Sequence, residues 1–182
     1  NPQIIATINN ISKKYDQKQI INNLSFKILR GEKIGIIGKN GSGKSTFLEI
    51  LTKKIQPTSG TIKHANDIAI SYFDQNRNEI KDNMTLHDIL CENGSDYVQL
   101  ANNKLRHVCG YLKDFLFDPK DLKTKASTLS GGQQNRLLLS KILANPGNFL
   151  ILDEPTNDLD MQSLDILEEY LLNYQGTLIV VS

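Results

Sequence analysis

The sequence predicts an α/β fold built on a parallel sheet, because buried apolar strands alternate along it with helical segments. Short runs rich in Ile, Leu and Val at 33–38, 149–152 and 177–181 have the composition of strands that are covered on both faces. The first two are followed by loops and then by segments with a helical spacing of apolar residues. Strands that alternate with helices in this way form parallel sheets, since a parallel connection needs a crossover.

Size and composition describe an ordinary globular domain. The chain has 182 residues, of which 39% are hydrophobic and 23% charged, and its net charge is +1. These values exclude a collagen-like chain, low-complexity disorder and a disulfide scaffold. They also exclude a strongly basic nucleic-acid coat or an acidic tail, although a local charged patch remains open.

The cysteines and the apolar runs indicate a cytoplasmic protein. Cys91 and Cys109 have no metal-ligand spacing, so we expect two reduced thiols in helical segments. The longest apolar runs, 149–152 and 178–181, are far shorter than a bilayer span, and no secretory leader opens the chain. We therefore expect a soluble piece of a longer protein, without direct membrane insertion.

The N-terminal part has strand-like patterns, and one helix interrupts them. Alternation at 4–11 places Ile4, Ala6 and Ile8 on one side of a strand, and further strands are expected at 20–28, 61–63 and 68–73. From Gly43 the spacing of apolar residues becomes helical and extends to Ile55, which places Lys53 and Lys54 in the last turn of that helix.

The middle of the chain has a helical pattern from about residue 80 to 145. Thr85 and Asp88 form a capping-box pattern at the start of a short helix that runs through Cys91. Apolar residues spaced by three and four predict an amphipathic helix over 97–117, and another helix is expected at 131–143. A last helix is expected at 161–174, after the buried strand at 149–152.

The strongest chemical motif is the run GKNGSGKS at Gly38–Ser45, which we call the phosphate loop. It matches the pattern G-x-x-x-x-G-K-[ST], it follows a predicted buried strand, and it opens a predicted helix. Its glycines allow successive backbone N–H groups to face one concavity, beside the positive end of the helix. Lys44 would contact the β- and γ-phosphates of a nucleotide, and Ser45 would bind Mg²⁺.

Two carboxylates follow the apolar strand at 149–152. Asp153 would lie at the carboxyl edge of the sheet beside the phosphate loop, where it could hold Mg²⁺ directly or through water. Glu154 is a candidate to polarise an attacking water. The alternative for Glu154 is a solvated charge at the end of a strand.

A second anion-binding element is expected at Leu129–Gln133, LSGGQ, which we call the signature segment. Ser130, Gly131 and Gly132 precede an apolar-striped helix, so backbone N–H groups of its first turn could bind phosphate. The alternative is a simple N-cap followed by a glycine turn. Since one phosphate loop already serves one triphosphate, a second such element suggests a site that two subunits share.

In this order and spacing, the phosphate loop, LSGGQ and LILDEP resemble the nucleotide-binding domain of the ATP-binding cassette superfamily over essentially the whole chain. Three segments are similar to family F cassettes, which have no membrane domain: SYFDQ at 71–75, QQNRLLL at 133–139 and EPTNDLD at 154–160. The last has Asn-Asp where transporter cassettes more often have Ser-Ala. Within family F, the region 106–117 resembles the second cassette of Uup-like proteins.

The resemblance implies a P-loop ABC-type ATPase core, at 1–79 and 146–182, with an N-terminal antiparallel β subdomain. The helical subdomain at 80–145 is inserted into it. ATP and Mg²⁺ are the implied cofactors, with Glu154, Gln75 and Lys44 in catalysis and Ser45, Gln75 and Asp153 at the metal. The residues implied to bind the nucleotide are Tyr15, Gly38, Lys39, Asn40, Gly41, Ser42, Gly43, Lys44, Ser45, Thr46, Ser130, Gly131, Gly132 and Gln133.

Some of these roles have alternatives. Tyr15 would stack on adenine, but it could also be an ordinary tyrosine at a strand edge. The signature segment would bind the γ-phosphate held by a second cassette, in the same chain or in a dimer, and 158–160 would link the two cassettes. Family members carry a switch histidine after a strand like 178–182. None of the three histidines of this chain lies there, so we expect this piece alone to bind ATP but hydrolyse it poorly.

Three functions are compatible with these motifs. The first is a soluble family F ATPase whose paired cassettes remodel a ribosome or nucleic-acid partner, which EPTNDLD and QNRLLL favour. The second is the ATPase subunit of a membrane transporter, and the third is a clamp that hydrolyses ATP only to reset. Basic residues outnumber acidic ones at 104–125, which is either a nucleic-acid contact or a solvated helical face.

Overall fold

The computed structural model describes residues 3–74 and 80–182, which form two compact units. The first unit contains the described residues up to Ile70, together with Gly147–Asp153 and Gln175–Ser182. The second contains the described residues of Ser71–Pro146, together with Glu154–Tyr174. The expected fold class is confirmed, since the structure combines a parallel sheet, an N-terminal antiparallel sheet and a helical region.

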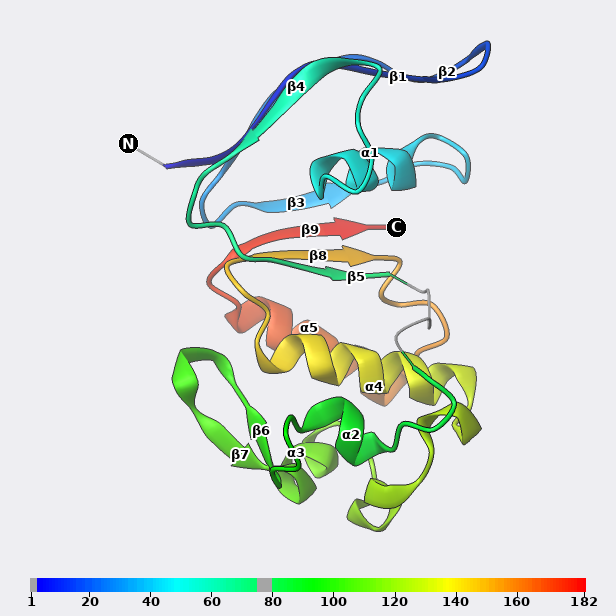
Figure 1. Ribbon diagram of the computed structural model, residues 1–182, viewed down its shortest axis with the longest axis vertical. Helices are drawn as coiled ribbons and strands as arrows, with labels where there is room; N and C mark the ends of the chain where they lie inside the picture. Colours follow the sequence, from blue (N-terminus) through cyan, green and yellow to red (C-terminus); the bar gives the residue numbers. More distant parts are fainter. Residues whose placement is uncertain (1–2, 75–79) are drawn as a thin grey trace. The chain divides into compact units, whose positions relative to one another are not determined.

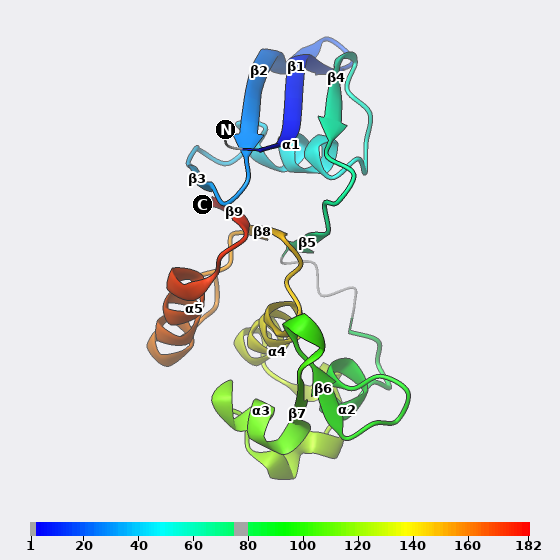
Figure 2. The same ribbon diagram turned by 90° about the vertical axis from the view of Figure 1, so that its left-hand side faces the viewer.

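The antiparallel sheet of the first unit has the order β2-β1-β4. Its strands are β1 (Ile4–Tyr15), β2 (Lys18–Leu29) and β4 (Ser59–His64), and Figure 2 shows them side by side. The predicted placement of Ile4 on one side of β1 with Ala6 and Ile8 is wrong, because Ile4 is 42% exposed whereas Ala6 and Ile8 are 1% exposed. A register shift between Ile4 and Ala6 breaks the alternation at this point, so neighbouring Ile5 and Ala6 are both buried.

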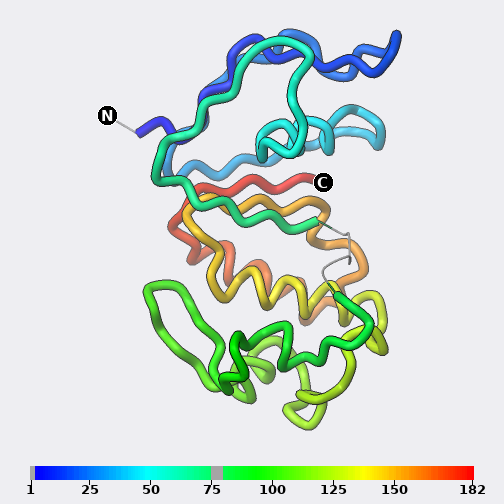
Figure 3. The backbone as a smooth tube through the Cα atoms, in the orientation of Figure 1, coloured from blue at the N-terminus to red at the C-terminus, as the bar shows by residue number. Residues whose placement is uncertain are grey.

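The parallel strands of the first unit are β3 (Lys33–Ile36), β9 (Thr177–Val181) and β8 (Phe149–Asp153). They lie in the order β3-β9-β8, although β3 is far from the other two in sequence (Figure 3). β8 and β9 are buried as predicted, and all four apolar residues of β8 are 0% exposed. The prediction that β3 is buried on both faces is wrong, because β3 is an edge strand and its residues are exposed or half-buried.

Helix α1 (Lys44–Leu51) follows β3 in the first unit (Figure 1), and its apolar residues Phe47, Leu48, Ile50 and Leu51 are buried. Its predicted extension to Ile55 is wrong, and Lys53 and Lys54 do not lie in its last turn. The helix ends early because Lys53 adopts a left-handed conformation with φ of 60°. The Thr52 hydroxyl donates to the Leu48 carbonyl at 2.8 Å in this last turn.

The second unit contains the helices that the sequence patterns and caps predicted best. These are α2 (Leu86–Leu90), α4 (Gly131–Ala144) and α5 (Met161–Asn173). The capping box of Thr85 and Asp88 is confirmed, and Cys91 is the C-cap of α2. β5 (Ile70–Phe73) begins in the first unit and continues in the second.

The predicted helix over 97–117 is wrong in its first half. The structure has a hairpin there, formed by β6 (Tyr97–Gln99) and β7 (Leu105–His107), and a shorter helix α3 (Val108–Asp114). Asn102 and Asn103 both adopt left-handed φ angles near 60°, which a helix cannot accommodate. The remaining short 3-10 turns are η2 (Ala101–Asn103), η3 (Pro119–Lys123) and η4 (Ala126–Thr128).

The two compact units divide the chain differently from the predicted subdomains. The predicted helical subdomain at 80–145 is one continuous insertion, whereas the second compact unit also contains Glu154–Tyr174. The predicted boundaries therefore stay a prediction. Over residues 3–74 and 80–182, no helix combines the length and apolar character that a membrane span requires.

The buried strand β8 should dominate the stability of the first unit. We predict that Leu150→Ala lowers the free energy of unfolding by about 2–5 kcal/mol, because it leaves a cavity at a fully buried site. Leu172→Ala is the matched control, since Leu172 is 77% exposed, and should change stability by less than about 0.5 kcal/mol. Urea unfolding of both variants measures the difference, and equal losses would contradict the placement of β8.

Candidate functional site

The phosphate loop connects β3 to α1 in the first unit, and glycine shapes it. Gly41 and Gly43 have φ angles of 81° and 93°, a region that other residues rarely adopt. Gly43 is also the N-cap of α1, and a Cβ there would lie 2.9 Å from Ile20 Cγ2 and 3.1 Å from the Ile20 carbonyl oxygen. Only glycine therefore fits between the loop and β2.

The Lys44 ammonium lies over the same loop. Its Nζ donates hydrogen bonds to the Gly38 carbonyl and, at 3.1 Å, to the Ser182 carbonyl at the end of β9. Lys39, Asn40, Gly41 and Ser42 are exposed. The N–H groups of the first turn of α1 have no partners within that helix, as at any helix start. The loop therefore combines a positive charge with backbone donors, which suits a phosphate group.

The carboxylate of Asp153 lies on the same edge of the sheet. Asp153 pairs with Val181 across β8 and β9, and Val181 pairs with Ile36, directly before the phosphate loop. The parallel register thus brings the end of β8 and the loop to one edge. The strand ends are thus arranged as the sequence predicted, and a metal-binding role for Asp153 stays a prediction.

The donor set at this edge fits Mg²⁺. The hydroxyl of Ser45, in the first turn of α1, and the carboxylate of Asp153 are the hard oxygen donors that Mg²⁺ prefers. In the described part of the chain, no group of three or more His, Cys, Asp or Glu residues could hold a metal ion. Mg²⁺ is usually bound by one or two protein oxygens together with phosphates and water. The predicted ligand Gln75 lies outside the described residues.

Tyr15 lies at the end of the β1–β2 hairpin and is 48% exposed. The Lys13 ammonium lies 5.1 Å from the centre of its ring. The hairpin end is next to the phosphate loop, because Gly43 faces Ile20 and the adjacent Gln19 pairs with Lys14. Stacking of Tyr15 on a base stays a prediction that this proximity supports.

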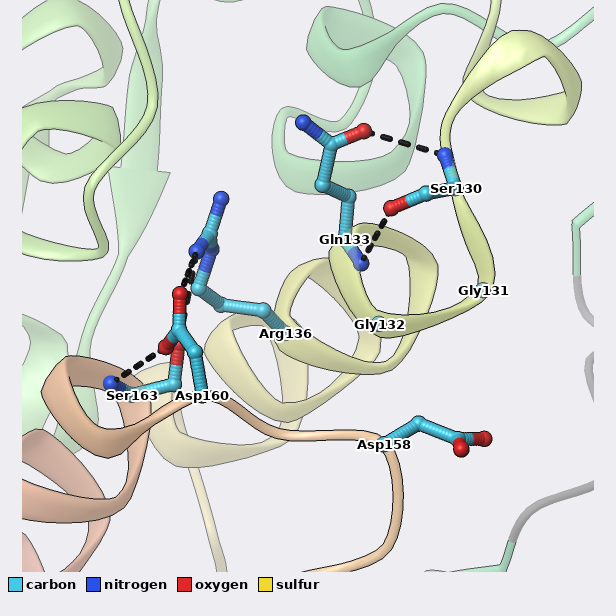
Figure 4. A pocket seen from close by; sticks show the side chains of 8 residues that line it. All are labelled: Ser130, Gly131, Gly132, Gln133, Arg136, Asp158, Asp160 and Ser163. Atoms are coloured by element: carbon cyan, nitrogen blue, oxygen red, sulfur yellow. Dashed lines mark hydrogen bonds and ion pairs between the residues drawn. The ribbon is translucent and has the colours of Figure 1, made fainter.

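The signature segment forms the start of α4 in the second unit. The Ser130 hydroxyl accepts from the Gln133 N–H at 3.3 Å, and the Gln133 side chain accepts from the Ser130 N–H at 3.0 Å (Figure 4). These two hydrogen bonds form a capping box. The alternative interpretation of the signature segment, a helix N-cap at Ser130, is therefore confirmed as a structural feature. A binding role for Ser130, Gly131, Gly132 and Gln133 stays a prediction.

A cavity of about 600 Å³ opens beside this helix start. Polar side chains and bare backbone dominate its lining, which comes from the N-terminal part of α4 and from the segment leading into α5 (Figure 4). The lining residues are Ser130, Gly131, Gly132, Gln133, Arg136, Asp158, Asp160 and Ser163.

The segment Glu154–Asp160, which we call the 154–160 turn, precedes α5. Glu154 and Asp158 have left-handed φ angles of 49° and 61°. Asp160 is the N-cap of α5 and accepts from the Ser163 N–H at 2.8 Å. Asp153 belongs to the first unit and Glu154 to the second, so the two carboxylates belong to different compact units.

Arg136 is a site residue that the sequence reasoning missed. Arg136 lies within the segment 133–139, directly after the signature segment. Its guanidinium donates to the Ser163 hydroxyl at 3.3 Å, lies 3.6 Å from the Asp160 carboxylate, and lies 4.6 Å from the centre of the Phe117 ring. The sequence did offer one signal for such a role: an arginine on the apolar side of a predicted helix needs a partner for its charge.

The matched family model has the description "ABC transporter" and covers residues 21–157. The chain is 47% identical to the ATP-binding protein Uup of Haemophilus influenzae and 43% identical to that of Escherichia coli. Each match covers 99% of this chain and 28% of that protein. It is 36% identical to the energy-dependent translational throttle protein EttA of Mycobacterium tuberculosis, covering 98% of this chain and 32% of EttA. The chain thus spans about a third or less of the length of each of these relatives.

Solved structures confirm the fold. One is a dimeric ATP-binding cassette in a post-hydrolysis state bound to ADP and Pi. It is 25% identical and has a TM-score of 0.75, covering 98% of this chain and 88% of that chain. Another is an inward-facing putative metal-chelate type ABC transporter, at 22% identity and a TM-score of 0.71. That match covers 99% of this chain and 74% of the other, and it shows the fold alone.

Asp160 should make the stability of the second unit depend on pH. Hydrogen bonds from Ser163, and then the charge of Arg136, lower the pKa of Asp160. A carboxylate with a lowered folded-state pKa stabilises the protein above its unfolded pKa, and this contribution is lost as the pH falls through the folded value. Asp160→Asn should therefore reduce stability at about pH 7, and the deficit should shrink below about pH 4.

Urea unfolding at several pH values measures this deficit. Asp165→Asn is the control, because Asp165 is an exposed carboxylate on the same helix. A deficit for Asp160→Asn that stays constant down to about pH 2 would contradict the proposed charge contribution.

Proposed function

The chain belongs to the ABC transporter family of ATP-binding domains, and we propose that it is an ATP-binding and ATP-hydrolysing cassette of a family F protein. The observation that carries this proposal is the phosphate loop between β3 and α1, with Lys44 folded over it. The relatives named Uup and EttA, and the cassette bound to ADP and Pi, support the choice of ATP.

In this proposal the first unit binds the nucleotide. Backbone N–H groups of the loop and the Lys44 ammonium hold the phosphates, and Tyr15 stacks on the base. Ser45 and Asp153 hold Mg²⁺, which neutralises charge on the β- and γ-phosphates when it is bound. Gly41 and Gly43, whose φ angles are positive, place no side chain in the space that the phosphates need.

The second unit supplies groups for catalysis in a pair of cassettes. Its signature segment contacts the γ-phosphate of a nucleotide held by a second cassette, because the start of α4 presents backbone N–H groups there. Glu154 orients the attacking water and accepts its proton. Hydrolysis is then possible only when two cassettes close on the nucleotide. The dimeric cassette among the similar structures supports this arrangement.

We propose that the partner on which closure acts is a ribosome or a nucleic acid, with the ribosome favoured. The printed name of EttA connects that relative to translation. In the described part of the second unit, Lys104, Lys113, Lys120, Lys123 and Lys125 supply positive charge that could contact RNA phosphates.

Lys44→Ala tests the nucleotide site. We predict that it weakens ATP binding by about 10- to 100-fold, because hydrogen bonds to charged groups contribute about 1.5–3 kcal/mol each. Isothermal titration of the full protein measures the effect, with circular dichroism to check the fold, since Lys44 also bonds Gly38 and Ser182. Lys63→Ala, an exposed lysine on β4, is the control. Unchanged ATP affinity in Lys44→Ala would refute the site.

Glu154→Gln tests the partner in the full protein. Loss of the carboxylate should slow hydrolysis, so that the closed ATP-bound state persists and co-sediments with ribosomes in ATP but not without it. Lys44→Ala should not co-sediment under either condition. If the Glu154→Gln protein binds DNA and not ribosomes, the partner is a nucleic acid of another kind. If it co-sediments with ribosomes equally well without ATP, the proposed cycle is contradicted.

A further inference from the structure

One face of α4 is fitted against the 154–160 turn. Gly132, Asn135 and Arg136 are spaced by three and four residues, so they share a side of the helix. A Cβ on Gly132 would lie 2.4 Å from the carbonyl oxygen of Asp158, which means that the turn lies directly on the helix backbone. Arg136 contacts Asp160 and Ser163 at the far end of the turn.

Asn135 is the buried polar member of this face. It is 1% exposed, and it is followed along α4 by the buried residues Leu137 and Leu138. Its Nδ2 donates to the carbonyl oxygen of Asn157 at 3.3 Å. A buried amide is costly unless it is hydrogen-bonded, so this bond favours one position of the turn. The acceptor belongs to the main chain, and the bond therefore fixes the path of the turn itself.

Asn157 connects the helix to the beginning of the turn. Its carbonyl accepts from Asn135, while its N–H donates to the carbonyl of Glu154 at 3.3 Å. Glu154 has a φ of 49°, a strained conformation for a non-glycine residue that persists only with support from its surroundings. The two hydrogen bonds through Asn157 supply part of that support.

The hydrogen bond from Asn135 joins two segments that are far apart in the chain. Asn135 lies in QQNRLLL and Asn157 in EPTNDLD, 22 residues apart in the chain.

We propose that Asn135 is a positioning residue of the ATPase, which locks the 154–160 turn to the signature helix. The start of α4 and Glu154 then move as one body, so that phosphate contact at Ser130 is coupled to the placement of the catalytic carboxylate. This inference rests on the proposed roles of Ser130 and Glu154. Asn135 itself does not contact the nucleotide.

The test compares Asn135→Leu with Gln134→Leu in the full protein. Leucine matches asparagine in size but cannot donate to Asn157. Gln134 is the matched control, because its side-chain amide donates to the Ala126 carbonyl at 3.1 Å on another side of the helix. Asn135→Leu should lower kcat by about 3- to 10-fold, as expected for one lost hydrogen bond, and leave KM for ATP within about 2-fold. Gln134→Leu should leave both values unchanged.

Hydrogen exchange gives a second readout that does not depend on ATPase activity. In Asn135→Leu, exchange should accelerate at the N–H groups of Asn157 and Leu159, which bond within the turn, and not at those of Thr128 and Leu129. Gln134→Leu should show the opposite pattern. Asn135→Ser, whose hydroxyl is one atom too short to reach Asn157, replaces Asn135→Leu if that variant does not fold.

Unchanged kcat and unchanged exchange in the Asn135 variants would overturn the inference. A parallel fall of kcat in Gln134→Leu would also overturn it, since the effect would then be general destabilisation of α4. If the wild-type protein itself lacks ATPase activity, the proposed function fails, whereas the exchange pattern still decides whether Asn135 holds the turn.

Discussion

The phosphate loop depends on the close approach of Gly43 to Ile20. A Cβ on Gly43 would collide with Ile20, so only glycine allows the end of the loop to lie this close to β2. Residues 39–42 of the loop are exposed to solvent. The same approach brings the hairpin that carries Tyr15 next to the loop. The parallel register of β3, β9 and β8 adds Asp153 at that edge. The close approach of Gly43 and the parallel register together place the predicted nucleotide-site residues of the first unit.

The second unit is organised by an equivalent contact, between Gly132 and the carbonyl of Asp158. A glycine again lets main chain approach main chain, and next to this contact Asn135 bonds to Asn157 and Arg136 lies close to Asp160. The predicted site residues are divided between the two units: the phosphate loop and Asp153 belong to one, and the signature segment and Glu154 belong to the other.

Local signals explain what the sequence predicted. The apolar composition of 149–152 and 177–181 and the cap patterns at Thr85 and Ser130 are visible within a few residues, and the structure confirms them. The hairpin at 97–107 was missed, because its apolar residues happen to follow a helical spacing and two adjacent asparagines turn the chain. Asn135 and Arg136 were missed as functional residues, because their partners in the 154–160 turn and α5 lie more than 20 residues away.

We propose that the nucleotide site at one phosphate loop is completed by the signature segment of another cassette. ATP affinity and ATP hydrolysis by the full protein carrying Ser130→Arg test it most directly, with Ser127→Arg, an exposed serine of η4, as the control. The account predicts that ATP affinity stays within about 2-fold while hydrolysis falls by at least about 10²-fold, as for loss of a group that contacts transition-state charge. Loss of ATP affinity in step with hydrolysis, or unchanged hydrolysis, would contradict a shared site.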